Sequence, residues 1–342
     1  MTSAARIGMR AARLFAALLF FAAVFSDFLS PCPASLQDLN EFFAPPARVH
    51  FTDAGGEFHW RPFVYRLELS NTLDVVYTER RDTAAPLRFF CGGYSYRWLG
   101  LIPMSLHLAC GESFHPLGTD ELGRDVMARL LAGARTSLFV VVLGVCIYAV
   151  IGLVLGSLAG MLGGWIDAAL MRLSEFVLAL PALYLILALR ALLPLGIPYW
   201  QALLLNVGII AGVAWPPMAR GVRGLIFQLR SAGYVEAARS IGCTPRQILV
   251  RHMLPALPPF VAAQAVLAAP IFLLGEVVLS FLDVGFRDTG ESWGTMLRAL
   301  KDPRVLTDFR WNLAPLVLVF ATLFCLNVVS NRVKAERDPV KL

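Results

Sequence analysis

A charged hairpin between two apolar stretches carries the residues whose types and spacing say most about function. Residues 234–255 read YVEAARSIGCTPRQILVRHMLP, with the run Glu236-Ala237-Ala238-Arg239 followed by Gly242. These residues form no catalytic constellation. A chain this apolar rarely keeps so polar a hairpin unless something soluble docks on it. The alternative is an ordinary polar connection between two spans.

The hairpin is expected to fold as a helix, a sharp turn and a second helix. The alanine-rich first arm favours helix, and Gly242 can supply the left-handed residue that ends it. Thr244 then suits the N-cap of the second arm, with Pro245 at its first position and Gln247 three residues after the cap.

Other kinds of chemistry are not supported by the sequence. The lysines are Lys301, Lys334 and Lys341, and none follows a glycine, so a G-x-x-x-x-G-K-[ST] phosphate loop cannot form. No G-x-S-x-G nucleophile motif occurs, and the histidines show no spacing that is typical of a metal site. We therefore expect no catalytic residues, no bound cofactor or metal, and any ATP to bind to another chain.

Composition indicates a membrane protein. Of the 342 residues, 57% are hydrophobic and 16% are charged, whereas soluble domains carry about 25% charged residues. The mean hydropathy is +0.65. The net charge of +6 would suit nucleic acid, but the basic residues stand at the ends of apolar runs. That distribution fits the anionic cytoplasmic leaflet and argues against nucleic-acid binding.

Six stretches are apolar and long enough to cross a bilayer. They are predicted at about 14–29, 138–162, 173–193, 200–218, 260–282 and 313–329. The first also resembles a signal peptide, but no clean cleavage site follows it, so a retained anchor helix is favoured. Kinks are expected at Pro181, Pro216, Pro217 and Pro270. The glycines Gly144, Gly152, Gly156 and Gly160 predict a face on which helices approach closely.

The arginines predict the orientation of these spans. Residues 220–255 hold six arginines against the single acid Glu236, and basic residues also mark the N-terminus and the C-terminal tail. Placing all three in the cytoplasm satisfies the positive-inside rule with an even number of spans. The polar segment from Ser30 to Thr136 is then extracytoplasmic, and its alternating run 63–69 indicates a few strands. Cys32, Cys91 and Cys110 lie in this segment, which leaves one disulfide among them open.

Two further motifs lie outside the hairpin. Residues 117–125 read LGTDELGRD, in which Thr119 or Asp120 is expected to cap a helix with Glu121 and Asp125 in its first turn. Arg124 is expected on a polar side of that helix. The run GEVVLSFL starts at Gly275 and is followed by SWGTML from Ser292.

Taken in order, these three motifs resemble the permeases of ATP-binding-cassette (ABC) importers for dipeptides, oligopeptides and nickel. The resemblance covers about residues 115–335 and is to the second of the two permease subunits. That subunit carries the string GTDxxGRD, here Gly118, Thr119, Asp120, Gly123, Arg124 and Asp125. The sequence departs from the family pattern at His252, usually aliphatic, and at Asp283, usually glycine. The segment before Gly118 is also longer than in many members.

The resemblance implies an all-α, type I importer permease with six transmembrane helices and an extracytoplasmic insertion between the first two. It implies a bacterial inner-membrane location and, as partners, a second permease, two ATPases and an extracytoplasmic solute-binding protein. Glu236, Ala237, Ala238, Arg239 and Gly242 would form the loop that the ATPase grips. The expected segments are an N-terminal anchor at 1–29, the insertion at 30–136, a core at 137–331 with the coupling loop at 228–255, and a tail at 332–342.

Glu276 is an ionisable residue within the predicted fifth span. Such residues are costly in a bilayer and usually face a bundle interior or an aqueous path. A role in the translocation path and a structural role are both open. Two other functions also remain, an ion-gradient-driven secondary transporter and a non-transporting assembly protein. Secondary transport would favour several intramembrane carboxylates and inverted repeats, whereas this sequence has chiefly Glu276.

Overall fold

A computed structural model describes residues 3–53, 55–71, 74–98, 100–111, 113–192, 197–283 and 290–337 of the chain. Leu193, at the end of the predicted third span, and the last five residues of the predicted tail lie outside these ranges. The chain divides into two compact units. The first comprises Met1–Ala12, Phe139–Leu279 and Leu323–Leu342, and the second comprises Arg13–Leu138 and Ser280–Thr322.

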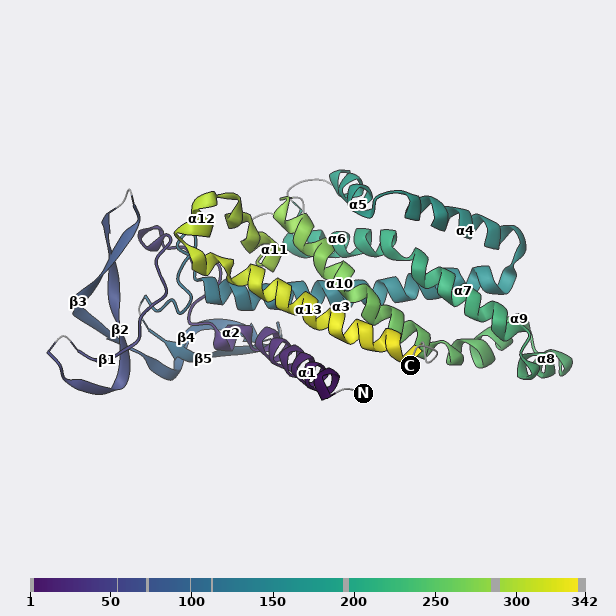
Figure 1. Ribbon diagram of the computed structural model, residues 1–342, viewed down its shortest axis with the longest axis horizontal. Helices are drawn as coiled ribbons and strands as arrows, with labels where there is room; N and C mark the ends of the chain where they lie inside the picture. Colours follow the sequence, from purple (N-terminus) through teal and green to yellow (C-terminus); the bar gives the residue numbers. More distant parts are fainter. Residues whose placement is uncertain are drawn as a thin grey trace. The chain divides into compact units, whose positions relative to one another are not determined.

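Helices make up most of the described chain (Figure 1). The long ones are α1 (Ser3–Val24), α3 (Val126–Leu162), α4 (Gly164–Ala179), α5 (Ala182–Ala191), α6 (Tyr199–Ala214), α7 (Pro216–Arg230), α10 (Pro258–Phe281) and α13 (Ala314–Arg337). The short ones are α2 (Ser26–Leu29), α8 (Gly233–Ser240), α9 (Pro245–Ile248), α11 (Trp293–Met296) and α12 (Pro303–Thr307). A π-helical turn spans Leu249–Met253, and 3-10 turns span Leu39–Glu41, Leu254–Ala256, Leu297–Lys301 and Arg310–Leu313.

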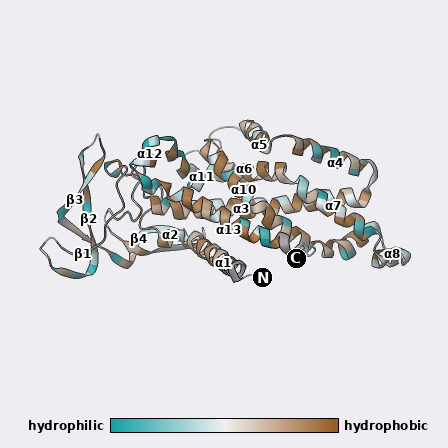
Figure 2. Ribbon diagram, in the orientation of Figure 1, coloured by the Kyte–Doolittle hydropathy of each residue, from teal (hydrophilic) through white to brown (hydrophobic). Residues whose placement is uncertain are grey.

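Three of the described helices are long and apolar enough to cross a membrane: Val126–Leu162, Pro258–Phe281 and Arg310–Val333. Apolar residues run along these helices in Figure 2. Two bent pairs raise the number to five if each pair forms one span. They are α4 with α5, bent by 95°, and α6 with α7, bent by 49°. The bends fall at Pro181 and Pro216, as predicted, since a proline removes a helical hydrogen bond.

The glycines of α3 form the predicted packing face within the first unit. A Cβ on Gly152 would lie 2.3 Å from Met218, and one on Gly156 would lie 2.5 Å from the carbonyl oxygen of Ala219. Gly160 meets Ile226 in the same way, so the three glycines let α3 lie directly against α7.

We expect Gly156→Ala to lower the free energy of unfolding by about 1–3 kcal/mol, because the added methyl must push the two helices apart. Gly208→Ala is the matched control. It also lies in a helix, but nothing lies within 4 Å of its Cβ position. Thermal unfolding of the two purified variants in detergent checks this, and equal melting temperatures would contradict the packing role.

The predicted insertion forms two small antiparallel sheets in the second unit. Strands β1 (His50–Thr52), β2 (Phe58–Asn71) and β3 (Val76–Pro86) form one, and β4 (Arg88–Trp98) and β5 (Ile102–Cys110) form the other. The strand expected at 63–69 is therefore confirmed as part of β2. A disulfide joins Cys91 to Cys110 with 6.3 Å between their Cα atoms, which links β4 to β5. Cys32 is a free thiol.

Candidate functional site

The hairpin in the first unit has the predicted helix–turn–helix form. Helix α8 ends before Gly242, whose φ of +87° is the left-handed conformation that glycine adopts at low cost. Its amide donates to the carbonyl of Arg239 at 2.9 Å. Thr244 and Gln247 form the expected capping box at the start of α9, with Pro245 at its first position. Beyond α9, the chain continues through the π-helical turn to Pro258.

Most of α8 and its turn is open to solvent. Glu236, Ala237, Arg239 and Gly242 are all exposed, whereas Val235 and Ala238 are buried and hold the helix against the rest of the unit. Ile241, at the tip of the turn, is 81% exposed. A large apolar side chain is thus presented to solvent beside the exposed, charged Glu236 and Arg239 of helix α8. We call residues 233–244 the α8 knob.

Ion pairs connect the helix before the knob to its neighbour. Arg223 on α7 binds both carboxylate oxygens of Asp167 on α4, and Arg220 donates to the Ser174 hydroxyl at 2.7 Å. Arg230 donates to the carbonyl of Gly160 on α3 at 3.3 Å. Three of the arginines that predict a cytoplasmic face therefore also tie α7 to α3 and α4.

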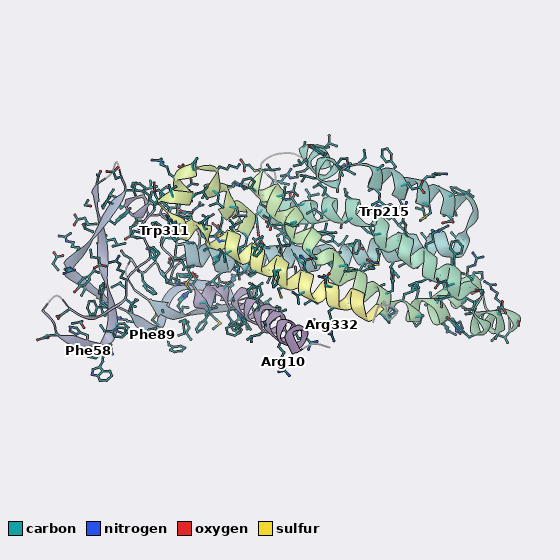
Figure 3. All side chains as sticks on the ribbon, viewed as in Figure 1. Arg10, Phe58, Phe89, Trp215, Trp311 and Arg332 are labelled. Carbon is teal, nitrogen blue, oxygen red and sulfur yellow. A yellow bond between two sulfur atoms is a disulfide. The ribbon has the colours of Figure 1, made fainter. Side chains whose placement is uncertain are left out.

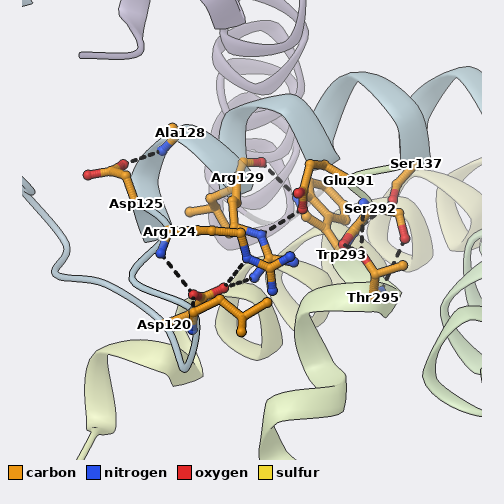
Figure 4. A network of polar contacts seen from close by, with 12 residues as sticks. Asp120, Arg124, Asp125, Ala128, Arg129, Ser137, Glu291, Ser292, Trp293 and Thr295 are labelled. Carbon is orange, nitrogen blue, oxygen red and sulfur yellow. Dashed lines mark hydrogen bonds and ion pairs between the residues drawn. The ribbon is translucent and has the colours of Figure 1, made fainter. Parts of the chain in front are cut away.

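In the second unit, Asp120 is the centre of a buried ionic network (Figure 4). One carboxylate oxygen accepts the backbone amides of Leu122 and Arg124, each at 2.9 Å. The other accepts the Arg124 guanidinium at 2.8 Å and the Arg129 guanidinium. Arg129 in turn donates to Glu291 at 2.6 Å. Two carboxylates thus balance two guanidiniums in a site that is largely shielded from water.

The predicted cap of the helix after LGTDELGRD is wrong. Neither Thr119 nor Asp120 caps it, because residues 118–125 form a closed loop and α3 begins only at Val126. Asp125 is the cap, and its carboxylate accepts the amide of Ala128 at 2.6 Å. Arg124 likewise lies in the loop and not on a helix side.

Tight backbone packing explains both glycines of this loop. Gly118 and Gly123 have φ of +72° and +68°. A Cβ on Gly123 would lie 1.7 Å from the carbonyl oxygen of Asp38, and one on Gly118 would lie 2.6 Å from that of Ala44. The Thr119 hydroxyl accepts the Ala44 amide at 2.7 Å and donates to the carbonyl of Glu41. The loop is therefore bonded to residues 38–44 on one side.

The same network unites two motifs that are far apart in the sequence. Besides the Arg129–Glu291 pair, the indole of Trp293 donates to the carbonyl of Leu130 at 3.1 Å. A Cβ on Gly133 would lie 3.0 Å from that indole ring. A second capping box, between Ser292 and Thr295, starts α11. The GTDELGRD and SWGTML motifs thus build one structure, which the sequence alone did not reveal.

His115 joins a further pair of carboxylates that the sequence did not single out. Its Nε2 lies 2.8 Å from Glu41 and its Nδ1 lies 2.8 Å from Asp125. Burial lowers the pKa of His115, but its hydrogen bonds to Asp125 and Glu41 outweigh this and raise the pKa from 6.5 to about 9. Burial also raises the pKa of Glu41, yet the bonds from His115 and Ser113 bring it below 4.5. His115 is therefore protonated at neutral pH, with a carboxyl group on each side of its ring.

This arrangement predicts a stability that depends on pH. Because the pKa of His115 is raised on folding, its contribution is complete below about pH 6.5 and is lost as the pH rises through about 9. The shift corresponds to at most about 3 kcal/mol. Melting temperatures should fall between pH 6.5 and 9 in the native protein and much less in His115→Gln. Parallel curves for the two proteins would contradict the ion-pair role.

Cys32 lies beside this triad, and the ligand atoms of Cys32, His115 and Asp125 lie within 4.8 Å of one another. The sequence indicated no such cluster, because its members are distant along the chain. Both nitrogens of His115 face carboxylates, and a protonated imidazole offers no lone pair to a metal. Burial, together with the charges of Asp125 and Glu41, raises the pKa of the Cys32 thiol well above its usual range. The cluster is thus a charge-paired structural centre.

The structure also locates Glu276 and Asp283, two residues that stand out in the sequence. Glu276 on α10 is 2% exposed, so it lies inside the first unit and not on its surface. Asp283 in the second unit has φ of +64°, which explains why a glycine suits this position. Its carboxylate pairs with Arg298 at 2.8 Å.

Comparison with known proteins identifies the family. The family described as "Binding-protein-dependent transport system inner membrane component" matches residues 152–335, more than half of the chain. The chain belongs to this family. Its matched region holds the α8 knob, Glu276 and the SWGTML motif. As a member of this family with several apolar helices, it is a multi-pass membrane protein.

Several known proteins align with this chain over most of their own length. The oligopeptide transport system permease protein OppC of Bacillus subtilis is 33% identical over 226 residues, which are 66% of this chain and 72% of that protein. The dipeptide transport system permease protein DppC of the same bacterium is 34% identical over 226 residues, 66% of this chain and 68% of that protein. A chain in an inward-facing structure of the MetNI methionine ABC transporter aligns over 60% of this chain and 97% of its own length. The two chains are 21% identical, and the TM-score is 0.43.

Proposed function

We propose that this chain is the membrane-spanning subunit of an ATP-driven importer for peptides, and that the α8 knob receives the force of ATP hydrolysis from a partner ATPase. Its relatives OppC and DppC are permeases of oligopeptide and dipeptide transport systems. The observation that carries the coupling role is the knob itself. Helix α8 and the turn that follows it present Glu236, Arg239 and Ile241 to solvent. A helix exposed in this way suits a groove on a soluble partner.

A mechanical route leads from the knob into the bundle. Only Ser231 and Ala232 separate α8 from α7, so movement of the knob displaces α7. Helix α7 carries α4 with it through the Arg223–Asp167 pair. It also lies against the glycine face of α3, where close backbone contact leaves little room for independent motion. Closure of the ATPases would in this way re-pack the spans and switch the side on which the pathway opens.

The proposed arrangement has six spans, with α1 and the two bent pairs joining the three long helices. Both termini and the α8 knob lie in the cytoplasm, and the insertion lies outside. The Cys91–Cys110 disulfide supports this placement, since disulfides persist in oxidising compartments. A second permease, two ATPases and a solute-binding protein complete the transporter. Glu276 is proposed to line or gate the path because it is a carboxylate inside the bundle.

Reconstitution tests the proposal. The chain with its partner permease and ATPases in liposomes should take up labelled peptide only when ATP and the binding protein are supplied, and uptake should persist when proton and sodium gradients are abolished. Uptake that needs such a gradient and ignores ATP would instead identify a secondary transporter.

A further inference from the structure

Near its turn, the β4–β5 hairpin carries large apolar and aromatic side chains on one face. On the apolar face lie Tyr96 and Trp98 of β4 and Ile102, Met104 and Leu106 of β5, which alternate along each strand. The intervening positions hold Arg97, Pro103 and Ser105. A strand that alternates in this way is expected to bury its apolar face. Here Ile102 is 50% exposed and Leu101, in the turn, is 82% exposed.

The hairpin is fastened to the end of α1 within the second unit. The Trp98 indole donates to the carbonyl of Val24, the last residue of α1, at 3.1 Å. The Trp98 ring stacks on Phe25 at 5.7 Å between centroids, and Phe25 contacts Phe21 at 4.6 Å. The hairpin is therefore fixed at the end of the first apolar helix.

An apolar groove opens at this junction. Phe21, Phe25 and Phe28 line one side, and Tyr96, Trp98, Met104 and Leu106 of the hairpin line the other, around a volume of about 310 Å³. Pockets of this size hold small ligands. Phe89 and Phe90 of β4 are also exposed close by in the chain, and Phe89 is labelled in Figure 3.

The groove continues a stripe along α1. Leu14, Leu18, Phe21 and Phe25 follow one another at intervals of four, three and four residues, which places them on one face of the helix. Leu14, Leu18 and Phe21 are exposed. At 1.5 Å per residue the stripe is about 16 Å long, close to half of a hydrocarbon core of about 30 Å. This is the length along which an acyl chain of one leaflet lies.

We propose that this groove binds an acyl chain of an outer-leaflet phospholipid, and that the apolar face of the β4–β5 hairpin rests in the membrane interface. The inference depends on the proposed function, in which α1 spans the membrane and the insertion lies outside. Trp98 is of a residue type that is enriched at membrane interfaces, whereas Tyr96 is buried at the base of the groove and donates to the carbonyl of Leu106 at 2.9 Å. Removing this face from water is favourable, since large apolar patches are rarely left exposed.

A fluorescent amino acid at two positions tests the proposal. The complete transporter carries an environment-sensitive fluorophore in place of Ile102, or as the control in place of Trp60, which is 90% exposed on β2 of the other sheet. Both are placed in nanodiscs of phosphatidylcholine that is brominated near the headgroup end of its acyl chains. The label at 102 should be quenched several-fold more by brominated lipid than the label at 60, and should be protected from aqueous iodide.

Two results would overturn the proposal. Iodide quenching at 102 as strong as at 60 would place the hairpin in water. Protection from both quenchers would mean that protein, such as the second permease, covers this face of the hairpin. Peptide uptake by the same labelled transporters, reconstituted in parallel into sealed liposomes, reports on the proposed function separately. Normal uptake with an aqueous label at 102 therefore contradicts only the lipid site, whereas absent ATP-driven uptake contradicts the transport role.

Discussion

Gly242→Pro should abolish peptide uptake while leaving the protein in the membrane at its normal level. Proline fixes φ near −65°, whereas residue 242 has φ of +87°. Proline also removes the amide that bonds to the carbonyl of Arg239. The α8 knob would lose its turn, and the ATPase would lose the surface that it grips. Uptake by reconstituted transporter and the amount of chain in the membrane are the two measurements.

Two further substitutions separate the turn from the rest of the fold. Gly242→Asn should retain most of the uptake, because asparagine adopts the left-handed conformation with little penalty and nothing lies within 4 Å of the Cβ position. Glu236→Lys changes an exposed side chain and leaves the turn intact. It should weaken ATPase binding by about tenfold, or about 1.4 kcal/mol. Peptide uptake at the native level by the Gly242→Pro variant would show that the α8 knob does not couple ATP hydrolysis to transport.

The second large effect concerns the buried network of the other unit. Asp120→Ala leaves Arg124 without its carboxylate and Arg129 with only Glu291, and it also removes the acceptor of two loop amides. Breaking a buried pair by removing one partner costs about 3–5 kcal/mol. We expect a loss of this size in the free energy of unfolding, together with a reduced amount of chain in the membrane. Thermal unfolding of the purified transporter measures it.

Glu121→Ala is the matched control for Asp120→Ala. Glu121 is the next residue and is also acidic, but its side chain is exposed. Substitution at an exposed site of this kind usually changes stability by less than about 0.5 kcal/mol. If the two variants unfold at the same temperature, the network does not hold the 118–125 loop to α3.

Local signals explain what could be predicted from the sequence. The turn at Gly242 and the capping box at Thr244 depend on residues within three or four positions of each other, and both are confirmed. The bends at Pro181 and Pro216 follow from the proline ring itself. The glycine face of α3 follows from a spacing of four residues on one helix.

Contacts between residues far apart in the sequence account for what could not be predicted. The residue types predict Thr119 or Asp120 as the cap of α3, because both make good caps. Asp120 instead binds two arginines and the amides of its own loop. His115 meets Glu41 across 74 positions of sequence. The disulfide between Cys91 and Cys110 depends on how β4 and β5 pair. In that register Cys91 lies opposite His107 and Cys110 lies opposite Arg88, so the two cysteines are close neighbours across the strands. No pattern of spacing encodes these contacts.

Site-specific photocrosslinking from the tip of the α8 knob tests the central claim most directly. A photoreactive amino acid replaces the exposed Ile241 in the complete transporter, with the buried Val235 on the same knob as the control position. Our account predicts a crosslink from position 241 to the partner ATPase, and none from position 235. A crosslink from 241 to the extracytoplasmic binding protein, or no crosslink to the ATPase in a transporter that imports peptide, would contradict it.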